Sequence, residues 1–457
     1  MDRVFKYIDD NSAKFVRDLQ ILLRQPSISA QDIGLTECAD LLVRLMNKSG
    51  VPSRAVPATE GPPVVFGELV SPGSDRVLLC AGHYDVQPPD PLEEWISDPF
   101  DAEIIDDVIY ARGVGDNKSG IMAFVQAAEA FLRVRGQPPV NLKFVYVGEE
   151  EIGDPHLEQW VIANTDLLKA DGMVNLDGGI DSATHSPRLL STVRSLLYLE
   201  LTAKGPTRDV HSGMSTMVTN PAWRLVHALG TMMNKEREIT IPDWNDELLP
   251  PTSAEDEYLK EAADRFEAQS VRNALGIEEF PPGQTPYDIL TDRHFKPTCN
   301  ICGFEAGYTG PGSKTIVPRD AVVKLDFRLP ANLEPEKQVE KLRRHLDKHG
   351  FQDVEIRVHT LKKIPWKVRL DDDVIQATVR AGEKVFGRRP VPLSVTSPAA
   401  LRTALFELHM DVPFAITGFG PPGGNLHAPN EYMPISYYIR GIKYAAAIMQ
   451  EFANETR

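Results

Sequence analysis

The stretch from Leu78 to Lys118 constrains the fold more than any other part of this 457-residue chain. An apolar run over residues 78–82 leads into His83, and Asp85 follows two residues later. Alternate side chains of a strand share a face, so this pair projects from one side of the strand. A second carboxylate, Asp116, stands in a glycine-containing turn at the end of the stretch. Imidazole and carboxylate are ligands of hydrolytic zinc-type sites, so one member of the pair can bind a metal while the other orients the ligands.

Strand-like and helical segments alternate on both sides of this stretch. Buried strands are predicted over 141–147 and 170–176, and such alternation is typical of an α/β fold with a mostly parallel sheet. In such sheets ligands bind at the carboxyl ends of the strands. Glu150 and Glu151 follow the first of these strands, and Asp177 follows the second. We therefore expect these acids to meet the histidine of the first stretch at one edge of the sheet.

The pattern changes after about residue 190. Residues 195–203 alternate as a half-buried strand does, whereas residues 241–298 are proline-spotted and are predicted to be irregular. The α/β pattern then returns near the C-terminus. The sequence predicts a catalytic domain made of residues 1–190 and 371–457, with a separate α+β domain of residues 191–370 inserted between them.

Composition limits the classes of partner. The chain has 49 basic and 65 acidic residues, a formal charge of −16, which disfavours binding to nucleic acid. No apolar run approaches the roughly 20 residues that span a bilayer, so no membrane partner is expected. The N-terminus is charged where a signal peptide needs an apolar core, which predicts a cytoplasmic location. The four cysteines are too few for a disulfide scaffold, and Cys299 and Cys302 form a C-x-x-C without a second pair.

Three consecutive acids, residues 149–151, end one predicted strand. Two interpretations are open. The three acids form a solvated acidic turn, or one glutamate binds a metal and its neighbour takes a proton from water. Each candidate ligand alone would read as a solvated residue or a helix cap. Together, two histidines and several carboxylates are enough for two metal ions with one carboxylate between them. The candidates are His83, Asp116, Glu150 or Glu151, Asp177 and His427.

Six segments that contain the candidate residues follow one another along the chain. They are Gly82-His83-Tyr84-Asp85-Val86-Gln87-Pro88, Arg112-Gly113 to Asp116-Asn117-Lys118, Glu150-Glu151-Ile152-Gly153, Asn175-Leu176-Asp177, Asp209-Val210-His211-Ser212-Gly213 and His427-Ala428-Pro429-Asn430-Glu431. In sequence and in order these segments resemble the M20 metallopeptidases, and the resemblance covers nearly the whole chain. That family includes carnosinase-type dipeptidases, aminoacylases, acetylornithine deacetylase, succinyl-diaminopimelate desuccinylase and glutamate carboxypeptidases.

The resemblance implies two divalent metal ions per subunit, with zinc favoured over cobalt or manganese. It makes Glu150 the general base and leaves Glu149 outside the site. It makes Asp85 the carboxylate that orients the metal cluster from behind. The implied ligands are His83 and Asp177 for one ion, Glu151 and His427 for the other, and Asp116 as the bridge between them.

The inserted domain resembles the lid or dimerisation domain of the family. By that resemblance His211 reaches the active site of the partner in a homodimer and polarises the substrate carbonyl. Thr315 and Arg328 match substrate-binding positions, and arginine can hold a carboxylate with two hydrogen bonds; the alternative for Arg328 is a salt bridge at a strand end. Carnosinase-like members carry Gly-Gly-Ser-Ile-Pro where this chain has residues 394–398, so Ser397 remains as a hydroxyl donor without the two glycines that let backbone approach a ligand closely.

The predicted function is hydrolysis of the amide bond of dipeptides or other small amides that end in a carboxylate. An N-acyl-amino-acid deacylase on the same scaffold is the first alternative, with an N-acyl amino acid in place of the small peptide. A non-catalytic binding or scaffold protein of the same fold is a more remote alternative. A missing ligand or base would favour that last alternative, and the sequence supplies every one of them.

Overall fold

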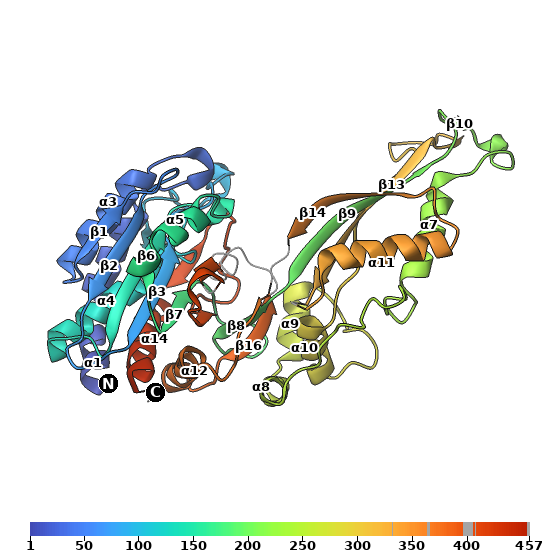
Figure 1. The fold of residues 1–457 in the computed structure, drawn as a ribbon. Helices are drawn as coiled ribbons and strands as arrows, with labels where there is room; N and C mark the ends of the chain where they lie inside the picture. Colours follow the sequence, from blue (N-terminus) through green and yellow to red (C-terminus); the bar gives the residue numbers. More distant parts are fainter. Residues whose placement is uncertain (331, 363–365, 396–404, 407, 455–457) are drawn as a thin grey trace.

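The structure is a computed structural model that describes residues 1–330, 332–362, 366–395, 405–406 and 408–454 (Figure 1). Ser397 lies outside the described residues. Within them, nine strands form a mixed sheet in the order β1-β2-β6-β3-β7-β17-β8-β15, with β16 paired to β8. These strands are β1 (Ser53–Val56), β2 (Val64–Leu69), β3 (Val77–His83), β6 (Asn141–Val147), β7 (Gly172–Leu176), β8 (Arg188–Val193), β15 (Trp366–Lys367), β16 (Val391–Val395) and β17 (Phe414–Thr417).

The centre of this sheet is parallel. Strand β3 pairs in parallel with β6 and β7, and β7 pairs in parallel with β17. The pairs β1–β2, β2–β6 and β17–β8 are antiparallel. The predicted α/β class is therefore confirmed, with parallel pairing concentrated in the middle of a mixed sheet. Because the central strands run the same way, their carboxyl ends lie at one edge.

Helices cover this sheet, and α4 begins at the edge where the central strands end. Every residue of α4 from Lys118 to Phe131 is buried, because the helix packs against β3 on one side and against α1, α2 and α14 on others. No helix of the described residues is long and apolar enough to cross a bilayer. The helices around the sheet include α1 (Asp2–Asp10), α2 (Ser12–Leu23), α3 (Leu35–Lys48), α4 (Lys118–Arg135), α12 (Asp373–Phe386) and α14 (Ile435–Asn454).

A second, four-stranded antiparallel sheet forms the other body in Figure 1. Its order is β11 (Asn300–Ala306), β13 (Asp320–Leu329), β9 (Ser195–Lys204) and β14 (Glu355–Lys362), and α7 (Pro221–Met232) and α11 (Pro335–Lys348) pack against it. Leucines at alternate positions of β9 enter a hydrophobic core separate from that of the large sheet. At the tip of this body β10 (Val210–His211) pairs with β12 (Ile316–Val317). The domain bounds near residues 190 and 370 stay a prediction.

The prediction that residues 241–298 are irregular is wrong. Three helices form there: α8 (Ser253–Asp264), α9 (Ala268–Leu275) and α10 (Pro286–Phe295). Thr252 and Glu255 form a capping box at the start of α8, and Thr285 and Asp288 form another at the start of α10. Pro286 stands at the first turn of its helix, where proline is tolerated. This proline therefore marks a helix start, and the two capping boxes were the available sequence signal.

Gly120 lets the start of α4 approach the end of β7. An added Cβ atom there would lie 2.3 Å from the carbonyl oxygen of Leu176. Because this oxygen belongs to the backbone, it cannot rotate out of the way as a side-chain atom could. This contact matters for the site, because Leu176 immediately precedes Asp177 and α4 begins two residues after Asp116.

We predict that Gly120→Ala lowers the free energy of unfolding by about 1–3 kcal/mol or more, since the added methyl group overpacks a rigid contact. Gly230→Ala in α7 is the matched control, because nothing lies within 4 Å of a Cβ atom at that position. That control should instead raise stability by up to about 1 kcal/mol. Urea unfolding followed by circular dichroism measures both changes, and equal stability of the two variants would contradict the packing argument.

Candidate metal centre

His83 ends β3 and is fully buried. Its Nδ1 lies 3.0 Å from the backbone carbonyl oxygen of Asp85, and its Nε2 lies 2.9 Å from Oδ1 of Asp116. A carbonyl oxygen only accepts hydrogen bonds, so the neutral ring carries its proton on Nδ1. The lone pair of Nε2 is then directed at the acidic cluster, as in a metal-binding histidine.

Asp116 lies between two histidines that are far apart in the sequence. Its Oδ1 faces His83, and its Oδ2 lies 3.1 Å from Nε2 of His427. That second ring is also 3.2 Å from Oε2 of Glu151, whereas Oδ2 of Asp177 is 3.8 Å from Nε2 of the first.

Two of the ligand groups that the structure assembles therefore share Asp116. In each group the candidate ligand atoms lie within 4.8 Å of one another. A third such group joins His83 to the two glutamates. The groups that share Asp116 are His83, Asp116 and Asp177, and Asp116, Glu151 and His427.

The cluster has a strongly negative potential. Contacts with Asp116 and Glu151 raise the pKa of His427 to about 10. Burial alone would lower the pKa of His83, but the charge of Glu150 and the contact with Asp116 raise it well above the usual value. Burial would likewise raise the pKa of Asp116, but its contacts with the two imidazoles lower it. Imidazoles whose pKa is raised by surrounding carboxylates mark a site that attracts positive charge, and this donor set fits divalent ions of the zinc class.

Asp85 joins the two halves of the cluster from behind. It is fully buried; its Oδ1 accepts a hydrogen bond from the backbone N–H of Glu150 at 3.2 Å, and its Oδ2 accepts one from that of Glu151 at 3.0 Å. The same residue contacts the ring of His83. Glu150 is buried, and its Oε2 lies 4.0 Å from Nε2 of that ring. Glu149 instead pairs with His156 at 2.9 Å, so the three consecutive acids do not share one environment.

Sequence reasoning assigned no role to several residues that hold the ligands in place. Gln87 donates a hydrogen bond from Nε2 to Oε2 of Glu151 at 2.9 Å. Asn117 accepts one from the backbone N–H of His83 and donates another to the carbonyl oxygen of Leu176 at 2.6 Å. Both stand inside the motifs that carry the ligands, so a polar residue next to a ligand motif was the only signal in the sequence.

The predicted catalytic and substrate-binding residues of the body that contains the second sheet lie elsewhere. His211 and Thr315 are brought together at the tip, where the backbone N–H of Ser212 donates to the carbonyl oxygen of Thr315 at 3.0 Å. Figure 1 places this tip at the end of the molecule away from the large sheet. Arg328, on β13, pairs through its Nε with Asp326 at 3.3 Å, the salt bridge that the sequence left open as its alternative.

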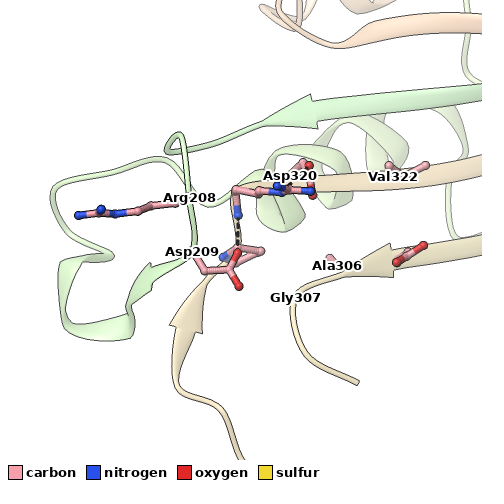
Figure 2. Close-up of a pocket in the computed structure, with 9 residues that line it drawn as sticks. Arg208, Asp209, Ala306, Gly307, Asp320 and Val322 are labelled. Atoms are coloured by element: carbon pink, nitrogen blue, oxygen red, sulfur yellow. Dashed lines mark hydrogen bonds and ion pairs between the residues drawn. The ribbon is translucent and has the colours of Figure 1, made fainter. Parts of the chain in front are cut away.

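A cleft of about 570 Å³ lies beside the same tip (Figure 2). Its charged lining residues are largely paired: Asp209 contacts Lys314 at 3.0 Å and accepts from the backbone N–H of Arg319, which also pairs with Asp320. In Figure 2 the side chain of Arg208 points away from these groups. The residues that line the cleft include none of the metal-ligand candidates.

Comparisons with known proteins agree over nearly the whole chain. A family model described as Peptidase family M20/M25/M40 matches residues 79–451. Beta-Ala-His dipeptidase of Homo sapiens is 28% identical over 99% of this chain and 93% of its own length. The Cys-Gly metallodipeptidase dug1 of Schizosaccharomyces pombe is 27% identical over 99% of this chain and 98% of its own length. The solved structure of Sso-CP2, an M20 family metallo-carboxypeptidase from Sulfolobus solfataricus, matches with a TM-score of 0.77 and 35% identity, covering 96% of this chain and 99% of its own.

We predict that His427→Ala weakens the binding of one divalent ion and leaves the other bound. The side chain is half exposed, so its removal should not disturb the core. Loss of a direct ligand should weaken affinity by more than the roughly 10–100-fold that loss of an outer partner costs. Metal content after dialysis, measured by mass spectrometry, should fall from two ions per chain toward one. His409→Ala removes a histidine that pairs only with Glu158 in the described contacts and should keep both ions; an unchanged count in His427→Ala would contradict the ligand assignment.

Proposed function

This chain belongs to peptidase family M20/M25/M40, and from that premise we propose that it is a dipeptidase whose site holds two metal ions. A hydrolytic enzyme is the only one of the predicted classes that fits this membership, which sets the non-catalytic alternative aside. The observation that carries the proposal is the carboxylate of Asp116, with one oxygen toward each of two histidines. Dipeptides are the proposed substrates because the two relatives named above are dipeptidases, and each matches this chain over nearly its whole length.

In the proposed site His83, Asp116 and Asp177 hold one divalent ion, and Asp116, Glu151 and His427 hold the second. Zinc is the proposed metal, and cobalt or manganese would suit the same ligands. Bound there, such ions lower the pKa of water and polarise the scissile carbonyl group. The partition follows the two ligand groups that share one carboxylate.

Glu150 is the proposed general base. It takes a proton from the attacking water and returns it to the amine that leaves when the amide bond breaks. Its buried position excludes bulk water, and the hydrogen bond from its backbone N–H to Asp85 fixes the turn on which it stands. Asp85 thus orients both the base and the ring of His83 without touching the substrate.

The proposed oxyanion partner is His211. Its Nδ1 accepts the backbone N–H of Gly213 at 3.1 Å, so the neutral ring carries its proton on Nε2 and can donate it to a developing negative charge. Arg328 keeps 38% of its side chain exposed and is proposed, with Thr315, to bind the substrate carboxylate. Because these residues belong to the body that contains the second sheet, we propose a homodimer in which His211 acts in the partner's site. A cytoplasmic location remains a prediction from the sequence.

We predict that Glu150→Gln lowers kcat by about 10²–10⁴-fold, the usual contribution of a positioned acid or base, and leaves metal content unchanged. Hydrolysis of a dipeptide panel by zinc-, cobalt- and manganese-loaded protein measures the effect. Acetylated and long-chain acylated amino acids in the same panel test the deacylase alternative, which would be favoured if only those compounds were cleaved. Full turnover by the variant would show that another group is the base.

The dimer is tested by complementation. Glu150→Gln and His211→Ala are each expected to be nearly inactive, but a mixed dimer of the two variants has one site with both groups intact. Random pairing of co-expressed chains gives about half mixed dimers, each with one active site of two, so about 25% of wild-type activity should return. Activity no higher than that of either variant alone would mean that each site uses its own chain's His211.

A further inference from the structure

We propose that Glu431 is a positioning residue that fastens the turn carrying Asp116 to the loop carrying His427. The inference rests on the proposed function, because the two side chains that Glu431 positions are ligands only if the metal centre exists. Glu431 itself belongs to none of the three assembled ligand groups. Its effect on the reaction therefore passes entirely through the geometry of other residues.

Both carboxylate oxygens of Glu431 are fully used by one short turn. Oε2 accepts hydrogen bonds from Nη1 of Arg112 and from the backbone N–H of Gly113, both at 2.8 Å. Oε1 accepts from the backbone N–H of Gly115 at 2.7 Å and from that of Asp116 at 3.1 Å. A carboxylate has about four acceptor positions, so all of them serve residues 112–116. With 1% of its surface exposed, Glu431 is the buried centre around which this turn is wrapped.

The same residue ties the turn to the other ligand loop. Glu431 follows His427 by four residues, and its backbone carbonyl oxygen accepts from the N–H of Ala111 at 3.1 Å. Immediately afterwards β18 (Tyr432–Pro434) pairs with β5 (Val108–Tyr110), which leads into the turn. The contact of 3.1 Å between Asp116 and His427 is therefore held from behind by side-chain and backbone bonds to a single residue.

Arg112 explains why a charged group can serve this purpose. Its guanidinium is 1% exposed and lies 5.3 Å from the ring centre of Trp95, so the ion pair with Glu431 is shut off from water. A buried pair of this kind is costly to break from one side, because the remaining charge has no partner. A glutamine would match the shape of Glu431, but its amide NH₂ would face N–H donors that need an acceptor.

The test compares Glu431→Gln with wild type in metal affinity and in the visible spectrum of the cobalt-loaded protein. Competition with a chromophoric chelator should show the more weakly held ion bound about 10–100-fold less tightly, the usual loss for an outer partner of a metal site. The cobalt spectrum should change, since it reports ligand geometry. The control is Glu129→Gln in α4, which removes another buried carboxylate, 2% exposed and paired with Lys14 at 2.7 Å, away from the turn at residues 112–116. It should lower the unfolding temperature and leave metal affinity and spectrum unchanged.

A merely structural role would give Glu431→Gln the same result as the control, with lower stability and wild-type metal binding, and that outcome would overturn the inference. If Glu431→Gln does not fold, Arg112→Lys decides: it keeps the charge, weakens one of the four bonds, and should reduce affinity by a smaller factor. Unchanged affinity in Arg112→Lys under those conditions would equally overturn the inference. A wild-type chain that bound no divalent ion would instead overturn the proposed function itself.

Discussion

The carboxylate of Asp116 between two imidazoles is the contact on which the rest of the site depends. One oxygen faces His83 at the end of β3, and the other faces His427 in a loop more than 300 residues later. The parallel centre of the large sheet supplies the first ring and the acids after β6 and β7, because parallel strands end at a common edge. The second ring needs a separate attachment, which the bonds of Glu431 to the turn before Asp116 provide.

This arrangement brings several negatively charged carboxylates close together. Asp85, Asp116, Glu150, Glu151 and Asp177 approach two imidazoles, and the raised pKa values of both rings express that imbalance. Like charges this close favour whatever brings positive charge, whether a proton on a ring or a divalent cation between the ligands. Since the ligands stand on segments far apart in the chain, a bound cation would also link those segments and stabilise the folded protein by mass action.

The sequence predicted best the elements whose pattern is local and strong. Strand 141–147 has the bounds expected for it, and the strand expected over 195–203 ends one residue later than predicted, because the apolar pattern of each is local and regular. Residues 241–298 were misjudged because proline was read as a breaker although Pro286 opens a helix. The ligand candidates were identified because each stands at a predicted strand end or in a loop that contains glycine or proline. The bonds of Glu431 to the turn at residues 112–116 could not be predicted, because no local pattern reveals a contact across more than 300 residues.

The residues proposed for the chemical step and those proposed for substrate recognition lie in different bodies of the molecule. The groups that can hold cations and move a proton all lie at one edge of the large sheet, whereas His211 and Thr315 lie at the outer tip of the small one. In this arrangement a residue at that tip lies away from the metal centre of its own chain, so the role proposed for His211 needs either a second subunit or a differently oriented state of the same one. These two routes make different demands on the protein. The first needs a stable dimer, whereas the second needs a change in the connection between β8 and β9, where the chain passes from one sheet to the other. Arg194, between β8 and β9, bonds to the carbonyl oxygens of Arg293, Lys296 and Arg328. That anchorage opposes a large swing about this connection, which favours the dimer.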